Sequence, residues 1–589
     1  MPVIRATICI LALSLSACSE RPAEPESTGS PESAISDARI DQIANEFVAA
    51  YYEHYPETVY EIGYPDAPMD RFGDHSEAST AAWHKQVDNW LAELNAIDPA
   101  TVDSAATART YVFAREKLQS IVDRRICKTE LWNISPTWTG WQYMFASTLA
   151  IQPAGTVAEK QAALARLADI ERYLETEISN LRRGQDSGYT AGQNNVDAVA
   201  AKITSLVETP AEESPFFSPA ARSDDAEFIA TYTDVLQSTV VPAMTAYRDF
   251  LLNDYDGHAG PGVGANPNGA ECYAASVRYH ASISMDAQEI HRTGLSEMAR
   301  IQSEMLQIAQ ETFGTDDVKG LLAELRTNPE YTFNDEQHML DYIRAAVARG
   351  KAVVGDWFAH VPDAEMEIVA APPYDKDSGG GFYSAGSADG SRPGTYTVGT
   401  YNPTTISIAG QEATAFHESY PGHHLQMATA LMNESSHPIF RYMYVSGSGE
   451  GWGLYAEKLA DEMGLYSSEL DRLGMLSNEA YRAARLVIDP GIHVLGWSRD
   501  EAIQYMLDHT TQGMDGVTSE IDRYSAVPGQ ATSYLLGSLE IQRLRQHAEE
   551  TLGDAFDIRE FHDTLIRDGS VTLPMMGAAV EAWIRRQQP

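Results

Sequence analysis

The chain has 589 residues, 43% of them hydrophobic, so it is long enough to bury a large core and to form more than one domain. It carries 84 acidic residues against 42 basic ones, which gives a formal net charge of −42 at pH 7. Such a charge repels nucleic acid and anionic lipid, which argues against a DNA- or RNA-binding role. The acidic excess fits solubility in a salty medium better than a preference for cationic ligands.

The N-terminus has the features of an export signal. Residues 1–18 contain Arg5, an apolar run and a Leu-Ser-Ala-Cys sequence ending at Cys18, which is typical of a cleaved signal rather than a membrane span. This sequence resembles the bacterial lipobox, so we expect Cys18 to carry lipid, with ordinary cleavage nearby as the alternative. Ser19 resembles the residue that sorts lipoproteins to the outer membrane, and we expect an anchor on the periplasmic face. Residues 19–36 are rich in Pro, Ser and Glu and predict a disordered tether.

Two cysteines remain after Cys9 leaves with the signal and Cys18 takes the lipid, namely Cys127 and Cys272. In an oxidising compartment they could form one disulfide, but two free thiols are equally compatible with the sequence. No Cys-x-x-Cys pair is present, which excludes a thiolate zinc site.

Apolar residues recur at helical spacing through most of residues 37–350. Pro56 should end the first helix, and a long helix is expected from about 286 to 312. Between 365 and 408, short aromatic and β-branched segments alternate with Gly and Pro, which predicts strands. These segments are Met366–Ala371, Gly381–Ser387 and Gly394–Tyr401. The last of them would either offer an open edge to an extended peptide or form a small structural hairpin. After residue 450 the chain is expected to be helical again.

A histidine-rich motif, A-T-A-F-H-E-S-Y-P-G-H-H-L-Q, occupies residues 413–426. It contains the adjacent pair His417–Glu418, and Glu450 follows at the start of E-G-W-G-L-Y-A-E. Two imidazoles and a carboxylate are the ligands of a catalytic zinc that keeps one position open for water. A carboxylate directly after the first histidine can take the proton of that water. The motif therefore predicts His417 and Glu450 as zinc ligands and Glu418 as the general base.

The second histidine ligand is displaced from its usual place, because Pro421 occupies the position of the second histidine in H-E-x-x-H. On a continuous helix, at about 100° per residue, His424 returns to within roughly 20° of His417, whereas His423 points about 120° away. Seven residues also rise about 10.5 Å, so the Pro421–Gly422 break would have to bulge to draw both rings to one metal. We favour His424, with His423 as the alternative.

Longer motifs surround this region: E-G-W-G-L-Y-A-E, R-L-V-I-D-P-G-I-H-V-L-G-W and P-G-Q-A-T-S-Y-L-L-G-S-L-E-I. With H-E-S-Y-P-G-H-H-L-Q they resemble the bacterial family called domain of unknown function 885 (DUF885), from about residue 40 to the C-terminus. The resemblance implies distant kinship with zinc peptidases such as thermostable carboxypeptidases, oligopeptidases and angiotensin-converting enzyme. It also implies a mainly α fold, a two-lobed helical shell around a deep cleft with a small β-sheet next to the metal-site helix.

On this basis residues 37–589 are expected to form a single domain, with an N-terminal lobe over about 37–350 and a catalytic lobe over about 351–589. The zinc peptidases carry a second acidic residue seven places after the glutamate ligand, which implies that Glu457 orients a ligand from behind.

Catalysis also needs a donor for the oxyanion and a group that holds the peptide end. Tyr534 and His493 are candidate donors to the oxyanion. Arg523, with Tyr524 beside it, could bind a substrate C-terminal carboxylate in a bidentate fork. Each of these residues has a structural alternative, as a buried polar side chain or as an ion-pair partner.

Together these features predict a secreted, lipid-anchored zinc metallopeptidase that cleaves short peptides in an enclosed cleft. Its expected cofactor is Zn²⁺, and its only expected contact with the membrane is the lipid anchor. One alternative is a non-catalytic periplasmic lipoprotein that binds peptide or metal. Another is a zinc hydrolase of a non-peptide amide or ester.

Overall fold

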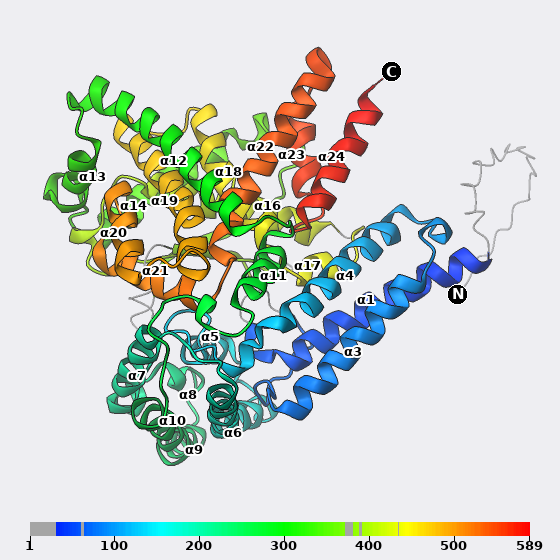
Figure 1. Cartoon of the computed structure of the whole chain (residues 1–589), viewed down its shortest axis with the longest axis vertical. Coiled ribbons are helices and arrows are strands. Elements are labelled where there is room, and N and C mark those ends of the chain that lie inside the picture. The colour runs from blue at the N-terminus through cyan, green and yellow to red at the C-terminus, as the bar shows by residue number, and fades with distance from the viewer. Residues whose placement is uncertain (1–30, 60–63, 372–380, 388–391, 434, 589) are drawn as a thin grey trace, which may run out of the picture.

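The computed structural model describes residues 31–59, 64–371, 381–387, 392–433 and 435–588. The expected signal peptide, Cys18 and most of the expected tether lie outside these residues. The fold is mainly α, as predicted, with one small sheet (Figure 1). Among the described helices, none is long and apolar enough to cross a membrane.

The N-terminal third forms two helical groups. Long helices at one side of the molecule in Figure 1 are α1 (Pro31–His54), α3 (Glu77–Ala96) and α4 (Ala105–Arg124). A second group lies below them and comprises α5 (Trp141–Ile151), α6 (Val157–Ser187), α7 (Gln193–Glu208), α8 (Ser218–Ala221), α9 (Ala226–Val235) and α10 (Val241–Asn253). The first helix stops before Pro56, as the sequence predicts.

The middle of the chain continues with helices and then the sheet. The helices are α11 (Gly269–Ala281), α12 (Ala287–Ile308), α13 (Val318–Thr327) and α14 (Glu336–Val353). Helix α12 matches the helix expected over 286–312, and the Asp286 side chain caps it by accepting a hydrogen bond from the Glu289 N–H (2.9 Å).

Three short strands follow, β1 (Met366–Ala370), β2 (Gly381–Ser384) and β3 (Gly394–Val398), in the order β1-β3-β2. β3 is parallel to β1, with Gly394 opposite Met366, and antiparallel to β2, with Val398 opposite Gly381. The three predicted strands are therefore present. The open edge expected at residues 394–401 is wrong, because β3 is the central strand and both of its sides are already paired.

The C-terminal third of the chain is helical and lies mostly in the upper part of Figure 1. Its helices are α15 (Gln411–Glu418), α16 (His423–Met432), α17 (Ile439–Tyr442), α18 (Ser446–Glu462), α19 (Glu469–His493), α20 (Arg499–His509), α21 (Met514–Ala526), α22 (Ser533–Leu552), α23 (Ile558–Ile566) and α24 (Leu573–Gln587). Helix α19 is buried along most of its length and therefore lies at the centre of this part of the fold.

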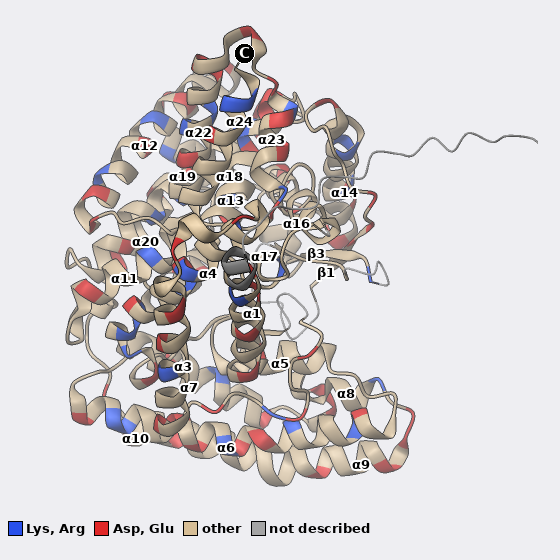
Figure 2. Cartoon of the chain, turned by 90° about the vertical axis from the view of Figure 1, so that its right-hand side faces the viewer, with Lys and Arg blue, Asp and Glu red and all other residues tan. Residues whose placement is uncertain are grey.

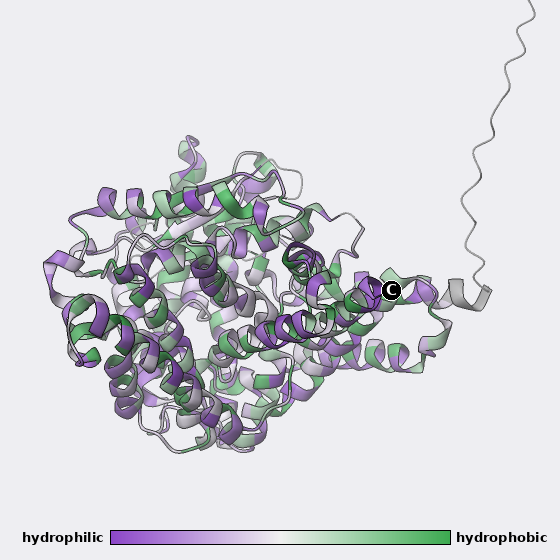
Figure 3. Ribbon diagram, turned by 90° about the horizontal axis from the view of Figure 1, so that it is seen from above, coloured by the Kyte–Doolittle hydropathy of each residue, from purple (hydrophilic) through white to green (hydrophobic). Residues whose placement is uncertain are grey.

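Hydrophobic side chains fill three buried clusters. One lies among α5–α10, a second joins α1, α3 and α4 to α14, α18, α23 and α24, and a third joins α11–α13 to α19–α22. Two of the clusters thus draw residues from both sides of position 350. Figure 3 shows hydrophobic and hydrophilic residues mixed along the same helices, as expected for helices that bury one face. Acidic residues are scattered over many helices in Figure 2 rather than gathered in one patch.

A disulfide joins Cys127 to Cys272, two residues 145 positions apart. It links the turn after α4 to α11, and both cysteines are buried. The structure thus pairs the two thiols that the sequence left open.

Helices α18 and α22 approach each other unusually closely, and glycine makes this possible. A Cβ on Gly537 of α22 would lie 1.8 Å from the Gly447 carbonyl oxygen and 2.8 Å from the Gly451 Cα of α18. A Cβ on Gly451 would in turn lie 2.6 Å from the Gly537 Cα. Backbone therefore packs on backbone here, and this contact fixes the position of α18.

Gly537→Ala should lower the free energy of unfolding by about 1–3 kcal/mol, because the added methyl group can only be accommodated if the two helices separate. The control is Gly516→Ala in α21, where a Cβ meets nothing within 4 Å and alanine is the better helix former. Urea unfolding of the two variants measures the difference. Equal midpoints would show that α18 and α22 can move apart freely.

Candidate metal centre

The first histidine of the motif stands near the end of a short helix. α15 ends at Glu418, so His417 is its penultimate residue, and both side chains are buried. Residues 419–422 are not helical, and α16 then begins at His423. A Cβ on Gly422 would lie 1.9 Å from the His417 carbonyl oxygen, so only glycine fits this connection without displacing the end of α15.

The break between α15 and α16 determines which of the two later histidines lies next to His417. The imidazole Nε2 atoms of His417 and His423 lie 3.6 and 3.4 Å from the same oxygen, Oε2 of Glu450. The two rings are perpendicular, with centroids 4.7 Å apart. Among the described residues, His417, His423 and Glu450 are the one set whose His, Cys, Asp or Glu donor atoms all lie within 4.8 Å of one another.

His424, the favoured second ligand, lies elsewhere. Its Nδ1 is hydrogen bonded to the Tyr383 hydroxyl of β2 (3.0 Å), and its Nε2 to the Tyr420 hydroxyl (2.9 Å). Burial lowers the pKa of His424 to about 4. The angular argument for His424 assumed one continuous helix, and it fails because α15 and α16 are separate helices. The bond to Tyr383 also shows that the sheet lies next to this helix pair, as expected.

Helix α18 supplies two carboxylates from one face. Glu450 and Glu457 are seven residues apart, which is close to two helical turns. His417 lies between them, with its Nε2 toward Glu450 and its Nδ1 2.9 Å from Oε1 of Glu457. Glu457 thus contacts the first histidine through the ring nitrogen that does not face Glu450, as the family resemblance implies. It fixes the His417 tautomer by accepting the Nδ1–H, which leaves a lone pair on Nε2.

A glycine makes room for the His417 ring. A Cβ on Gly453 would lie 2.6 Å from Nε2 of that ring, so any larger residue would push the imidazole away. The indole N–H of Trp452 donates to the Pro421 carbonyl oxygen (3.0 Å), which fastens the connection between α15 and α16 to α18. These contacts explain why E-G-W-G accompanies H-E-S-Y-P-G-H-H in the sequence.

The charges of the cluster are strongly coupled. Burial opposes ionisation of Glu450, but ion pairing with His417 and His423 holds its pKa well below its usual range. Burial would lower the pKa of His417, but its contacts with Glu450 and Glu457 outweigh it and raise that pKa to about 9. The cluster is therefore a buried site of mixed charge that stabilises a proton on His417, and a metal ion bound there would displace this proton.

Glu418, the predicted base, faces the same charges. Burial raises its pKa, while the nearby His417 and His423 act in the opposite direction. A carboxylate whose pKa is raised accepts a proton more readily than an ordinary glutamate. The Glu418 side chain has no hydrogen bond or ion pair with another described residue, which leaves its oxygens available to a ligand.

Two tyrosines complete the surroundings. Tyr444 donates its hydroxyl to Oε1 of Glu450 (3.0 Å), and sequence reasoning missed it because no motif marks its position. Tyr534 is close enough to feel the charge of Glu450, and burial together with that charge raises its pKa. The Arg485 guanidinium stacks on the Tyr534 ring, 4.4 Å from its centroid. Tyr534 thus keeps its proton and stays a hydrogen-bond donor.

The candidate role of His493 as oxyanion donor stays a prediction, while the structure shows backbone groups on both sides of its ring. Its Nδ1 accepts from the Val263 N–H (3.0 Å), and its Nε2–H donates to the Tyr524 carbonyl oxygen (3.0 Å). Both ring nitrogens are therefore occupied by backbone groups. Burial lowers the pKa of His493 to about 3, which keeps the ring neutral.

Arg523 and Tyr524 also have partners inside the protein. Arg523 forms a bidentate pair with Glu520, with both distances 2.9 Å, and its Nη1 donates to Oε1 of Gln530 (2.6 Å). Tyr524 donates its hydroxyl to Glu520 (2.8 Å) and accepts from Nε of Arg485 (2.7 Å). The arginine fork expected to hold a substrate carboxylate is thus occupied by Glu520 in this structure, and its role toward a substrate stays a prediction.

The chain is similar to a protein family and to solved structures over most of its length. A family described as "Bacterial protein of unknown function (DUF885)" matches residues 56–580. Among solved structures, the chain is similar to "the putative lipoprotein from Colwellia psychrerythraea", with a TM-score of 0.87 and 23% identity over 94% of this chain and 99% of that one.

It is also similar to "a putative lipoprotein of unknown function from Shewanella oneidensis", with a TM-score of 0.71 and 17% identity over 92% of this chain and 99% of that one. At such identities the likeness establishes the fold alone. No curated protein matches the chain.

The neutral state of His493 predicts a pH dependence. Its pKa lies near 3 in the folded protein against 6.5 as the ordinary value, so between these values the unfolded chain binds a proton that the folded chain does not. The free energy of unfolding should therefore fall as pH falls below about 6.5, by about 1.4 kcal/mol per pH unit from this group. His493→Gln should lose less stability between pH 7 and pH 5 than the unsubstituted protein.

Urea unfolding at both pH values measures this difference. His360→Gln serves as the control, because the His360 side chain is 87% exposed. Equal losses in the unsubstituted protein and in His493→Gln would mean that His493 takes up its proton in the folded state.

Proposed function

The chain belongs to the DUF885 family of bacterial proteins, and we propose that it is a zinc-dependent hydrolase that cleaves peptide bonds. The observation that carries this proposal is the convergence of the two Nε2 atoms of His417 and His423 on one oxygen of Glu450. Two imidazoles, which bind a metal ion after losing their proton, and one carboxylate form the donor set of a catalytic zinc rather than a structural one, which would have four protein ligands.

The chain's own residues fit a bound divalent ion in two ways. His417 presents an Nε2 lone pair because Glu457 accepts its Nδ1–H. Tyr444 holds one oxygen of Glu450 by a hydrogen bond and leaves the other facing the histidines. A zinc ion held there would supply a Lewis acid for a substrate carbonyl and would lower the pKa of a water molecule.

Glu418 then acts as the general base and acid. It follows His417 directly, it is buried, and its raised pKa suits it to accept a proton from the attacking water. The same carboxyl group can return that proton to the leaving amine. Tyr534 keeps its hydroxyl proton and stands near Glu450, so we assign it the donor role toward the developing oxyanion.

The sheet supports a peptide as the substrate. β2 is an edge strand, and among the described residues it pairs with β3 alone. Its Tyr383 bonds to His424, the residue next to His423, so this edge lies beside the cluster. An extended peptide could add to such an edge by backbone hydrogen bonds, with its scissile bond at the metal.

We further propose that the protein is anchored in the cell envelope through Cys18. Both similar structures are described as lipoproteins, and the sequence around Cys18 resembles a lipobox. The disulfide between Cys127 and Cys272 fits an oxidising compartment outside the cytoplasm.

The two adjacent histidines offer a matched test of the metal site. His423→Ala should abolish high-affinity zinc binding, because one of three protein ligands is lost. His424→Ala should retain zinc but lose about 1–3 kcal/mol of stability, because it removes the partner of two buried tyrosine hydroxyls. Metal content and calorimetric zinc titration of chelator-treated protein measure both effects. Zinc loss in His424→Ala with retention in His423→Ala would reverse the assignment.

Glu418→Gln tests the catalytic role. The variant should bind zinc as tightly as the unsubstituted protein, because Glu418 is not a proposed ligand, yet its turnover of a mixed peptide library should fall by about 10²–10⁴-fold. Mass spectrometry of the cleaved peptides provides the measurement, with parallel ester and non-peptide amide substrates. Full activity of Glu418→Gln would remove the base assignment, and an unsubstituted protein that binds zinc but cleaves no peptide would refute the peptidase proposal.

A further inference from the structure

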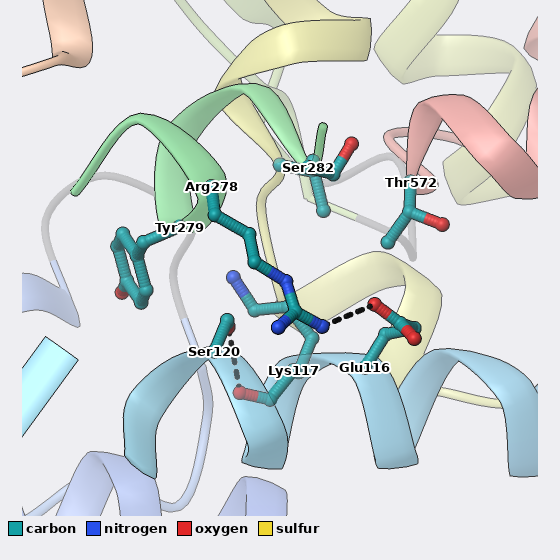
Figure 4. Close-up of a pocket in the computed structure, with 8 residues that line it drawn as sticks. Glu116, Lys117, Ser120, Arg278, Tyr279, Ser282 and Thr572 are labelled. Atoms are coloured by element: carbon teal, nitrogen blue, oxygen red, sulfur yellow. Dashed lines mark hydrogen bonds and ion pairs between the residues drawn. The ribbon is translucent and has the colours of Figure 1, made fainter. Parts of the chain in front are cut away.

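Cavities outside the candidate metal centre differ greatly in what they could hold. A small one between α4 and α11 measures about 10 Å³ and is lined in part by Lys117, Arg278 and Thr572 (Figure 4). It has room for about one water molecule. Its arginine is already paired with Glu116 (3.4 Å) and Asp123 (2.6 Å). This cavity offers no place for a ligand.

A larger cavity of about 380 Å³ lies among the N-terminal helices. Its helical walls come from α1, α3, α4, α5, α6, α7, α10 and α11, and none of its lining residues belongs to the candidate metal centre. The volume suits a small organic molecule. The chemistry of the walls therefore decides which class of molecule would bind.

Three carboxylates line this cavity, those of Glu57, Glu130 and Glu177. Glu57 already bonds to His75 (3.1 Å) and to the Gly73 N–H (3.0 Å). Glu130 and Glu177 form no hydrogen bond or ion pair with any residue that the structure describes. Burial, opposed by His75 and reinforced by Glu57 and Glu130, raises the pKa of Glu177 to about 7. With a pKa of about 7, Glu177 is ionised in only part of the molecules near neutral pH, and a bound cation would favour its charged form.

A buried hydroxyl also faces the same space. Tyr173 lines the cavity and is only 6% exposed, yet its hydroxyl has no hydrogen-bond partner among the described residues. Burial first, and then the charges of Glu177 and Glu57, raise its pKa well above the usual value. The Tyr173 side chain shares this cavity with Glu177 and Glu57, and its hydroxyl can accept a hydrogen bond from a bound donor.

Aromatic rings form much of the remaining wall, including Tyr55, Trp83 and Tyr247. Aromatic faces attract cations, most strongly where water is excluded. His54, which stacks on Trp83 with centroids 5.0 Å apart, adds no positive charge, because burial lowers its pKa to about 4.

Three basic residues also belong to the lining and have contacts of their own. Arg125 is paired with Asp88 (2.6 Å). The Arg124 guanidinium lies over the Tyr279 ring (4.5 Å), and the Lys128 ammonium lies over the Tyr189 ring (5.1 Å). None of the three forms an ion pair with Glu130 or Glu177 in the described structure.

We propose that this cavity binds a small organic cation carrying a primary ammonium group, held by Glu177, Glu130 and the Tyr173 hydroxyl between aromatic walls. An ammonium has three N–H donors, which matches two carboxylates and one hydroxyl. A single divalent metal ion fits less well. Among the described residues only His417, His423 and Glu450 bring three donor atoms of His, Cys, Asp or Glu within 4.8 Å of one another, so the cavity holds no such set of three for a metal ion.

Calorimetric titration of the full chain with n-butylamine and 1,4-diaminobutane tests this proposal, with n-butanol as the uncharged probe. The amines should bind and the alcohol should not. Glu177→Gln should weaken amine binding by about tenfold or more, because a charge-assisted hydrogen bond is lost. Tyr173→Phe, which removes only the hydroxyl, should weaken it by a smaller factor. The control is Glu175→Gln, an exposed site on the same helix, which should bind as the unsubstituted protein does.

Two further experiments ask which kind of molecule supplies the ammonium group and whether the cavity binds it independently of the metal centre. A dipeptide with a free amino end and its acetylated form show whether a peptide terminus is accepted, and binding of the free form alone supports the proposal. Amine binding should persist in chelator-treated protein and in His423→Ala, because the cavity shares no residue with the metal centre. Absence of amine binding, equal affinity in Glu177→Gln, or equal binding of n-butanol would overturn the proposal.

Discussion

The position of one imidazole between two glutamates of α18 governs the candidate site. The helical repeat places Glu450 and Glu457 on one face of α18, and His417 contacts one with each ring nitrogen. This arrangement needs α18 to lie very near α15, which Gly453 permits. It also requires that α18 keeps its position, and the contact between the glycines of α18 and α22 provides this. The chemistry therefore depends on positions that carry no functional group.

Much of the fold followed from the sequence because its signals are local. Helical periodicity, the Pro56 stop and the capping Asp286 depend on neighbouring residues, and all appear in the structure. The three strands were likewise marked by their composition. The pairing order was not, since it depends on contacts between segments that no local pattern records, and β3 proved central rather than an edge.

The candidate site was predicted in its composition but only partly in its geometry. His417, Glu418 and Glu450 were identified by type and spacing and Glu457 by the family resemblance, and the structure gathers them. The choice of His424 failed because the reasoning extended one helix across a break where two helices meet. No motif marked Tyr444, which contacts Glu450. Arg523 was expected to bind a substrate carboxylate, whereas in the structure its guanidinium pairs with Glu520. Gly422 and Gly453 were the signals that could have revealed the tight approach.

The bond between Cys127 and Cys272 has a practical consequence for any study of this protein. It closes a ring spanning 145 positions, and such rings persist only where thiol oxidants outweigh cellular reductants. Protein produced in a reducing cytoplasm would lack this disulfide, whereas protein recovered after export would contain it, although both have the same amino-acid sequence. Biochemical results from different hosts become comparable once the thiol content of each preparation has been matched.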